Sequence, residues 1–183
     1  MKKYKKTIVI LLTIFIFSCN ENKVKTINMG NYEIDIPSDW KEINQNGIDS
    51  NLIVILTAKG DTIISDFGEY SEKFEETNKV FSKKQLLKYK DMGMNTENLF
   101  WSNTPEIDQA QGTFLDEYYM YVIIDKHKSK LRIPKKEGKG FTGISIDSIK
   151  KSKNRLTIIG KNLNRIDSDL LVNSFNTIKF NNK

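Results

Sequence analysis

Apolar and polar residues alternate with a period of two over several short stretches, the pattern of strands that bury one face. Residues 24–28 and 32–36 predict a strand pair joined by a turn at 29–31. In the second strand, apolar positions alternate with Glu33 and Asp35. Pro37 ends this strand, because proline has no N–H to donate to a neighbouring strand. We place Trp40 in a turn that covers one end of the core.

A continuous apolar run at residues 52–58 predicts a central strand covered on both faces. The Lys-Gly-Asp sequence at 59–61 is a turn signal, so residues 62–67 are the returning strand of a hairpin. Residues 118–124 form a second strongly apolar strand, followed by a turn at 126–129. The remaining predicted strands are 130–133, 141–149, 155–160 and 177–180.

Two segments have helical patterns. In residues 82–92, Ser82 and Gln85 form a capping box, and Gly93 is a natural C-terminal cap. A second helix is predicted at 168–175, with acidic residues near its start. Residues 94–112 are predicted as loop, with a short strand near Leu99. About eight strands and two short helices with hairpin-length connections predict an α+β domain with a largely antiparallel sheet.

The N-terminal segment is basic, then apolar. Four lysines precede an apolar run at 8–17, which is shorter than the roughly 20 residues that a helix needs to cross a bilayer. This order predicts a secretory signal peptide at 1–18. Residues 16–19, Ile-Phe-Ser-Cys, resemble the lipobox of bacterial lipoproteins, in the looser form of Bacteroidota because of Phe17. A short signal anchor, or an ordinary signal peptide with an incidental Cys19, is the alternative.

The resemblance implies that Cys19 is the lipid attachment residue. Cys19 is the sole cysteine, so an exported form can have no intramolecular disulfide and relies on its hydrophobic core. We expect residues 19–23 to be a lipidated tether and residues 24–183 to be a single globular domain. The expected localisation is the bacterial cell envelope, with the outer membrane favoured and a periplasmic or surface face left open.

Charge is unevenly distributed. The formal net charge is +6, but the predicted signal peptide carries four of the 29 basic residues and no acid, so bulk charge does not favour nucleic-acid binding. Residues 61–76 are acidic and residues 126–139 are basic. These stretches are either solvated faces or, for the basic one, a hairpin that meets an acidic protein, a lipid headgroup or a glycan. The candidate partner-binding residues are Lys130, Arg132, Lys135, Lys136 and Lys139.

Motifs that suggest catalysis lack the context that catalysis needs. Residues 138–143 match G-x-G-x-x-G, but they open a predicted strand instead of a helix, so we interpret the glycines as turn residues. His127 is the only histidine and lies in a predicted exposed turn, which is a poor place for a general base or a zinc ligand. The adjacent acids at 75–76 and 116–117 point apart on a regular element. We therefore predict no catalytic residue, no metal and no cofactor.

The two ends of the predicted domain resemble a known family pair. Residues 34–40, Ile-Asp-Ile-Pro-Ser-Asp-Trp, and residues 170–180, Leu-Leu-Val-Asn-Ser-Phe-Asn-Thr-Ile-Lys-Phe, resemble the opening and ending of PsbP-type and Ran-binding Mog-type domains. The resemblance implies an α/β/α sandwich around an antiparallel sheet. It also favours a binding or accessory role, although residues specific to photosystem II or Ran binding have no match here.

The sequence predicts a lipid-anchored cell-envelope protein that acts as a non-catalytic binding or accessory module. An alternative is a periplasmic immunity-type lipoprotein that neutralises a toxin. Another is an envelope hydrolase with a site that the sequence does not reveal. We expect a membrane contact through the N-terminal lipid, an acidic protein, lipid headgroup or glycan as partner, and no nucleic acid.

Overall fold

The computed structural model describes residues 23–44, 51–74, 79–149 and 152–181. These ranges contain twelve strands and three helices, so the expectation of about eight strands and two helices was too low. The predicted class, α+β with a largely antiparallel sheet, is confirmed. Cys19, the signal peptide and most of the tether lie outside the described residues.

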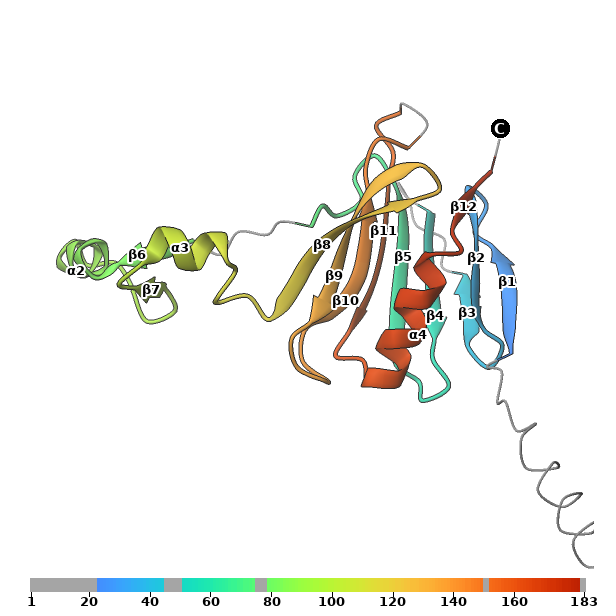
Figure 1. Cartoon of the computed structure of the whole chain (residues 1–183), viewed down its shortest axis with the longest axis horizontal. Coiled ribbons are helices and arrows are strands. Elements are labelled where there is room, and N and C mark those ends of the chain that lie inside the picture. Colours follow the sequence, from blue (N-terminus) through green and yellow to red (C-terminus); the bar gives the residue numbers. More distant parts are fainter. Residues whose placement is uncertain (1–22, 45–50, 75–78, 150–151, 182–183) are drawn as a thin grey trace, which may run out of the picture.

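A seven-stranded antiparallel sheet forms the body of the domain (Figure 1). Its order is β3-β4-β5-β11-β10-β9-β8. The strand predicted as central, β4, is next to the edge strand β3, because the chain returns after β5 to insert β11, β10 and β9 on the other side. The strands are β3 (Lys41–Asn44), β4 (Asn51–Leu56), β5 (Thr62–Gly68), β8 (Glu117–Ile124), β9 (His127–Pro134), β10 (Phe141–Ile146) and β11 (Arg155–Lys161).

One face of this sheet packs on a small sheet and a helix. The small sheet contains the predicted hairpin of β1 (Val24–Asn28) and β2 (Tyr32–Pro37), with β12 (Lys179–Phe180) on the other side of β2. Helix α4 (Arg165–Phe175) begins three residues before the predicted 168, because the side chain of Asn164 caps the backbone N–H of Asp167. The core between these layers is aromatic and aliphatic, with Met29, Tyr32, Trp40, Ile144, Leu156, Leu171 and Phe175 fully buried.

A buried hydroxyl pair fixes the two sheets together. The Tyr32 hydroxyl lies 2.5 Å from Oγ of Ser65, in β5 of the large sheet. Burial raises the pKa of Tyr32 well above its usual range, an effect that the Ser65 hydrogen bond partly opposes. Tyr32 therefore stays neutral and keeps this hydrogen bond throughout the physiological pH range.

The opposite face of the sheet, which we call the open face, is crossed by the stretch 69–74. Three side chains of the sheet donate to its backbone carbonyls: Lys130 to Phe74 at 3.0 Å, Thr157 to Glu72 at 2.6 Å, and Arg155 to Ser71. Phe74 is buried above Gly143, where a Cβ atom would lie 2.9 Å from the phenyl ring. The glycine thus leaves the space that Phe74 fills.

Residues 79–112 form an arm that projects away from the sheet (Figure 1). It contains β6 (Val80–Ser82), α2 (Lys83–Asp91), β7 (Phe100–Ser102) and α3 (Pro105–Ala110). The predicted helix at 82–92 and its capping box are confirmed in α2, whereas α3 lies where a loop was expected. The missed signal is Pro105 at the first helical turn, a position that proline favours.

Helices α2 and α3 belong to this arm, so α4 is the described helix that lies on the large sheet (Figure 1). The family resemblance implies helices on both faces of the sheet. In the described ranges, α4 supplies a helix on the face that also carries the small sheet. The helices in the described ranges are all too short or too polar to cross a bilayer.

The turn between β8 and β9 is tighter than predicted. Asp125 and Lys126 form it alone, with φ angles of 42° and 69°. His127 therefore belongs to β9 and is half-buried, whereas the sequence placed it in an exposed turn. Two consecutive left-handed residues match the right-handed twist of the flanking strands, which is why such short turns close hairpins.

Candidate functional site

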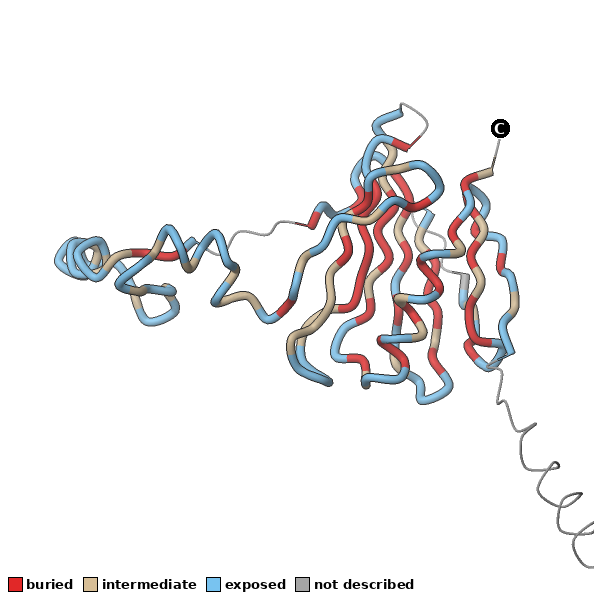
Figure 2. Tube along the Cα trace, viewed as in Figure 1, coloured by how far each residue is buried: buried red, intermediate tan, exposed pale blue. Residues whose placement is uncertain are grey.

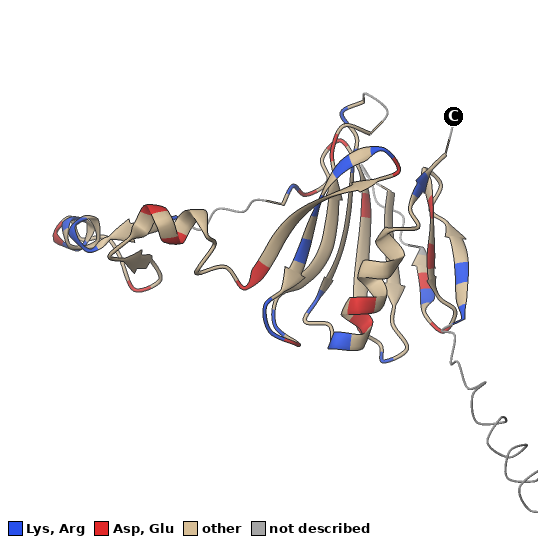
Figure 3. Ribbon diagram, viewed as in Figure 1, with Lys and Arg blue, Asp and Glu red and all other residues tan. Residues whose placement is uncertain are grey.

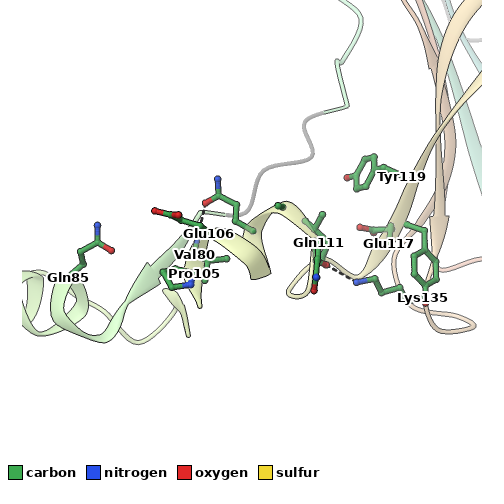
Figure 4. A pocket seen from close by; sticks show the side chains of 13 residues that line it. Val80, Gln85, Pro105, Glu106, Gln111, Glu117, Tyr119 and Lys135 are labelled. Carbon is green, nitrogen blue, oxygen red and sulfur yellow. Dashed lines mark hydrogen bonds between the residues drawn. The ribbon is translucent and has the colours of Figure 1, made fainter. Parts of the chain in front are cut away.

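A hollow of about 600 Å³ separates the arm from the start of β8 (Figure 4). We call it the junction pocket. Its walls come from α2 and α3 on the arm side, and from β8 and the loop after β9 on the sheet side. The polar side chains around it are Gln85, Glu106, Gln109, Gln111, Glu117, Tyr118, Tyr119 and Lys135.

Hydrogen bonds tie the arm together and to the sheet. Within the arm, the backbone N–H of Val80 donates to Oε1 of Gln109 at 3.2 Å. The ammonium of Lys135 donates to the carbonyl of Gly112 at 2.7 Å, which joins the end of the arm to the loop after β9 (Figure 4). These bonds hold both walls of the junction pocket.

The carboxylate of Asp108 accepts several hydrogen bonds near the start of α3. Hydrogen bonds from the hydroxyls of Ser102, Thr104 and Thr113 hold the pKa of Asp108 below its usual range. Two of these bonds are 2.9 Å, from Thr104, and 3.0 Å, from Thr113. The carboxylate thus joins β7, the start of α3 and the chain that returns to the sheet.

A buried ion pair forms the inner wall of the pocket. Glu117 is only 5% exposed, and its Oε2 lies 3.4 Å from a terminal guanidinium nitrogen of Arg132. Its Oε1 accepts a hydrogen bond of 3.0 Å from the backbone N–H of Phe141. Gly140, with φ of 103°, allows this approach, since a Cβ there would lie 2.8 Å from Oε1.

Aromatic rings surround the other partner of this pair. The guanidinium of Arg132 lies 4.4 Å from the ring centre of Phe141, 5.5 Å from that of Phe74 and 5.6 Å from that of Tyr119. Cation–π contacts of this kind favour arginine in partly desolvated sites. The Glu117 carboxylate and the three aromatic rings thus hold the Arg132 side chain in place on the open face.

The carboxylate of Glu117 is also held in place by its partners. Both of its oxygens are engaged, by Arg132 and by the Phe141 N–H, so it serves as a fixed hydrogen-bond acceptor. Figure 4 places Glu106 on the arm side of the pocket, away from Glu117. The amide, carboxylate, hydroxyl and ammonium groups that line the pocket can both donate hydrogen bonds to a polar ligand and accept hydrogen bonds from it. In the described ranges, no three His, Cys, Asp or Glu side chains gather as a metal site.

The predicted partner-binding residues fall into two groups. Lys130 and Arg132 lie in β9 and contact the open face, where Lys130 donates to Phe74. Lys135, Lys136 and Lys139 lie in the loop after β9, and Lys135 lines the junction pocket. Lys139 pairs with the exposed Asp116 at 3.0 Å. The structure therefore brings only the last three together near the arm.

The arm itself was not predicted as a site. Six of its large apolar side chains are exposed, whereas Val80 and Phe81 of β6 are buried, and neither of its helices buries a residue (Figure 2). The sequence offered a signal in the stretch 87–107, where apolar residues follow no strand period and only part of a helix period. The exposed members are Leu87, Met92, Met94, Phe100, Trp101 and Ile107.

Comparison with known proteins yields little. No family model and no curated protein matches this chain. The solution structure of cyanobacterial PsbP (CyanoP) from Synechocystis sp. PCC 6803 is similar over 90% of this chain and 96% of that chain, with 9% sequence identity and a TM-score of 0.40. A similarity of this size assigns no function.

Proposed function

We propose that this protein is a lipid-anchored binding module of the cell envelope, and that its arm is the surface that contacts a partner protein. The module holds or positions its partner and catalyses no reaction. The observation that carries the proposal is the arm: a folded projection that keeps large apolar side chains in solvent.

The apolar side chains of the arm suit a protein interface. Leu87 is 53% exposed, and Trp101 and two methionines of the arm are exposed as well. Single exposed apolar residues are ordinary, but their concentration on one projecting element indicates a contact surface. Tryptophan and methionine are also enriched where proteins bind each other.

The charge of helix α2 would suit an acidic partner, although the arm as a whole carries five lysines against four acids. Helix α2 carries four lysines and one aspartate. The loop after β9, with Lys136 and Lys139, lies across the junction pocket from the arm and is also basic (Figure 3). Complementary charge would speed association with an acidic protein, while the apolar side chains would supply affinity.

The anchor would place this surface at a membrane. A diacylglycerol on Cys19 with a further acyl chain supplies enough buried CH₂ groups for stable attachment. The lipid would be joined through the short tether to β1. As β1 lies across the domain from the arm, the arm would face away from the attachment point (Figure 1).

Replacing Cys19 with serine tests the anchor. We expect wild-type protein to incorporate radiolabelled palmitate and to fractionate with membranes. C19S should lose the label and, if it is still exported, appear in the soluble periplasmic fraction. Equal labelling of both proteins would contradict lipidation at Cys19.

Site-specific photo-crosslinking in living cells tests the arm. A photoreactive residue at Leu87 should yield a discrete cross-linked product, identified by mass spectrometry, that the same residue at the exposed Val24 of β1 does not yield. With the purified partner, L87D and W101A should each weaken binding about tenfold or more, as expected at interface hot spots. V24D is the matched control. Equal binding by L87D, W101A and V24D would overturn the assignment of the arm.

A further inference from the structure

A second hollow, of about 540 Å³, lies at the other end of β8, beside the β8–β9 hairpin. We call it the lysine pocket. Four lysines line it, Lys73, Lys126, Lys128 and Lys130, together with one acid, Asp147. Asp147 already pairs with Arg155, so it offsets little of the positive charge that the lysines present.

The strand register places a polar row across this pocket. Tyr121 of β8 lies opposite Lys130 of β9, and Lys130 lies opposite Ser145 of β10. Directly opposed residues in antiparallel strands share a face, so all three side chains lie on the open face. The ammonium groups of Lys128 and Lys130 lie 4.6 Å and 5.7 Å from the ring centre of Tyr121.

Ser145 gives the pocket an unused donor. It is 5% exposed and lines the pocket, and its hydroxyl has no hydrogen-bond partner among the described residues. A buried hydroxyl without a partner is costly, and most such groups in folded proteins are paired. The hydroxyl oxygen itself is covered, so a ligand oxygen in the pocket would supply the missing acceptor when a covering side chain moves aside.

The rim of the pocket is held firmly. The carboxylate of Asp125 accepts a hydrogen bond of 2.9 Å from the backbone N–H of Phe180 in β12. The His127 ring packs edge-on against Phe180 at 5.0 Å between centres. These contacts fix the strained Asp125–Lys126 turn and therefore the backbone positions of Lys126 and Lys128.

From this arrangement we infer that the lysine pocket binds a phosphate group. A phosphate monoester carries nearly two negative charges at neutral pH and several strong acceptor oxygens. Such a dianion matches several ammonium groups and a buried hydroxyl donor better than a single carboxylate does, and lysine is a common phosphate ligand. The site is separate from the arm and does not depend on the proposed partner surface.

The phosphate could belong to a soluble compound or to a lipid headgroup. The test uses the full chain in detergent, titrated with inorganic phosphate, with dibutyryl phosphatidic acid, and with dibutyryl phosphatidylcholine as a headgroup control. Isothermal titration calorimetry measures the dissociation constant for each compound.

Two kinds of variant make the test specific. K126E/K128E should weaken phosphate binding at least tenfold, whereas K83E/K84E, the same charge change on α2, should have little effect. S145A should weaken binding about tenfold while leaving thermal stability equal or higher, because it removes a buried hydroxyl that has no partner.

Saturable binding of phosphate or phosphatidic acid, weakened in K126E/K128E and S145A, would support the site. A response to phosphatidic acid alone would identify a lipid headgroup, and a response to both would identify the phosphate group itself. No response to either, or equal weakening in K83E/K84E, would overturn the inference.

Discussion

Replacing Glu117 with alanine is expected to lower the free energy of unfolding by about 3–5 kcal/mol. The variant leaves the guanidinium of Arg132, whose side chain is only 16% exposed, without its carboxylate, and it removes the acceptor of the Phe141 N–H. Removing one partner of a buried pair costs more than the pair contributes, because the remaining charge is poorly solvated. Urea unfolding followed by tryptophan fluorescence measures the change, since Trp40 is buried in the core.

Asp116→Ala is the matched control for this prediction. Asp116 precedes Glu117 and also forms an ion pair, with Lys139, but both of these side chains are largely exposed. Its loss should cost less than about 1 kcal/mol, as is usual for surface pairs. Replacing both buried partners, in E117L/R132M, should recover much of the stability lost in E117A. Equal effects of E117A and D116A would show that the Glu117 pair contributes no more than a surface pair.

Replacing Phe74 with alanine should cost a similar amount, about 3–5 kcal/mol. Phe74 is 1% exposed, fills the space above Gly143 and contacts the guanidinium of Arg132. Its loss leaves a cavity on the open face and weakens the hold on the stretch that leads to the arm. The same urea unfolding measurement applies.

Two further variants test whether the effect of F74A comes from packing of Phe74 on Gly143, or whether any substitution in the stretch 69–74 lowers stability. Y70A changes a residue that is 84% exposed and should alter stability by no more than about 0.5 kcal/mol. G143A should destabilise the wild-type protein by about 1–3 kcal/mol, because the new Cβ meets both Phe74 and the Ile158 carbonyl. In the F74A background the cost of G143A should be smaller. Strict additivity of the two substitutions would contradict direct packing of Phe74 on Gly143.

Local patterns predicted the elements whose boundaries are set by nearby residues. The β1–β2 hairpin follows from strict alternation before Pro37, and α2 follows from the Ser82–Gln85 capping box. The start of α4 was placed too late, because Asn164 caps that helix outside the stretch with the apolar pattern. Helix α3 was missed because six residues give too little periodicity to distinguish a helix from a loop.

The basic stretch shows where sequence reasoning stops. The charge pattern identified Lys130 and Arg132 as candidate partner-binding residues. The contacts that their side chains make, however, depend on the residues opposite them in β8 and β10. Arg132 is held by Glu117 and three aromatic rings, and Lys130 by the Phe74 carbonyl. Whether these five basic residues bind a partner stays a prediction.

The sequence by itself determined the α+β class, most of the strands and the capped helix α2, because alternation, turn residues and caps act between neighbours in the chain. The tertiary structure alone decided the order of the strands, the packing of Phe74 on Gly143, the Glu117–Arg132 ion pair and the two pockets. These features join residues from separate parts of the chain, and their positions depend on strand order and register, which local patterns do not encode.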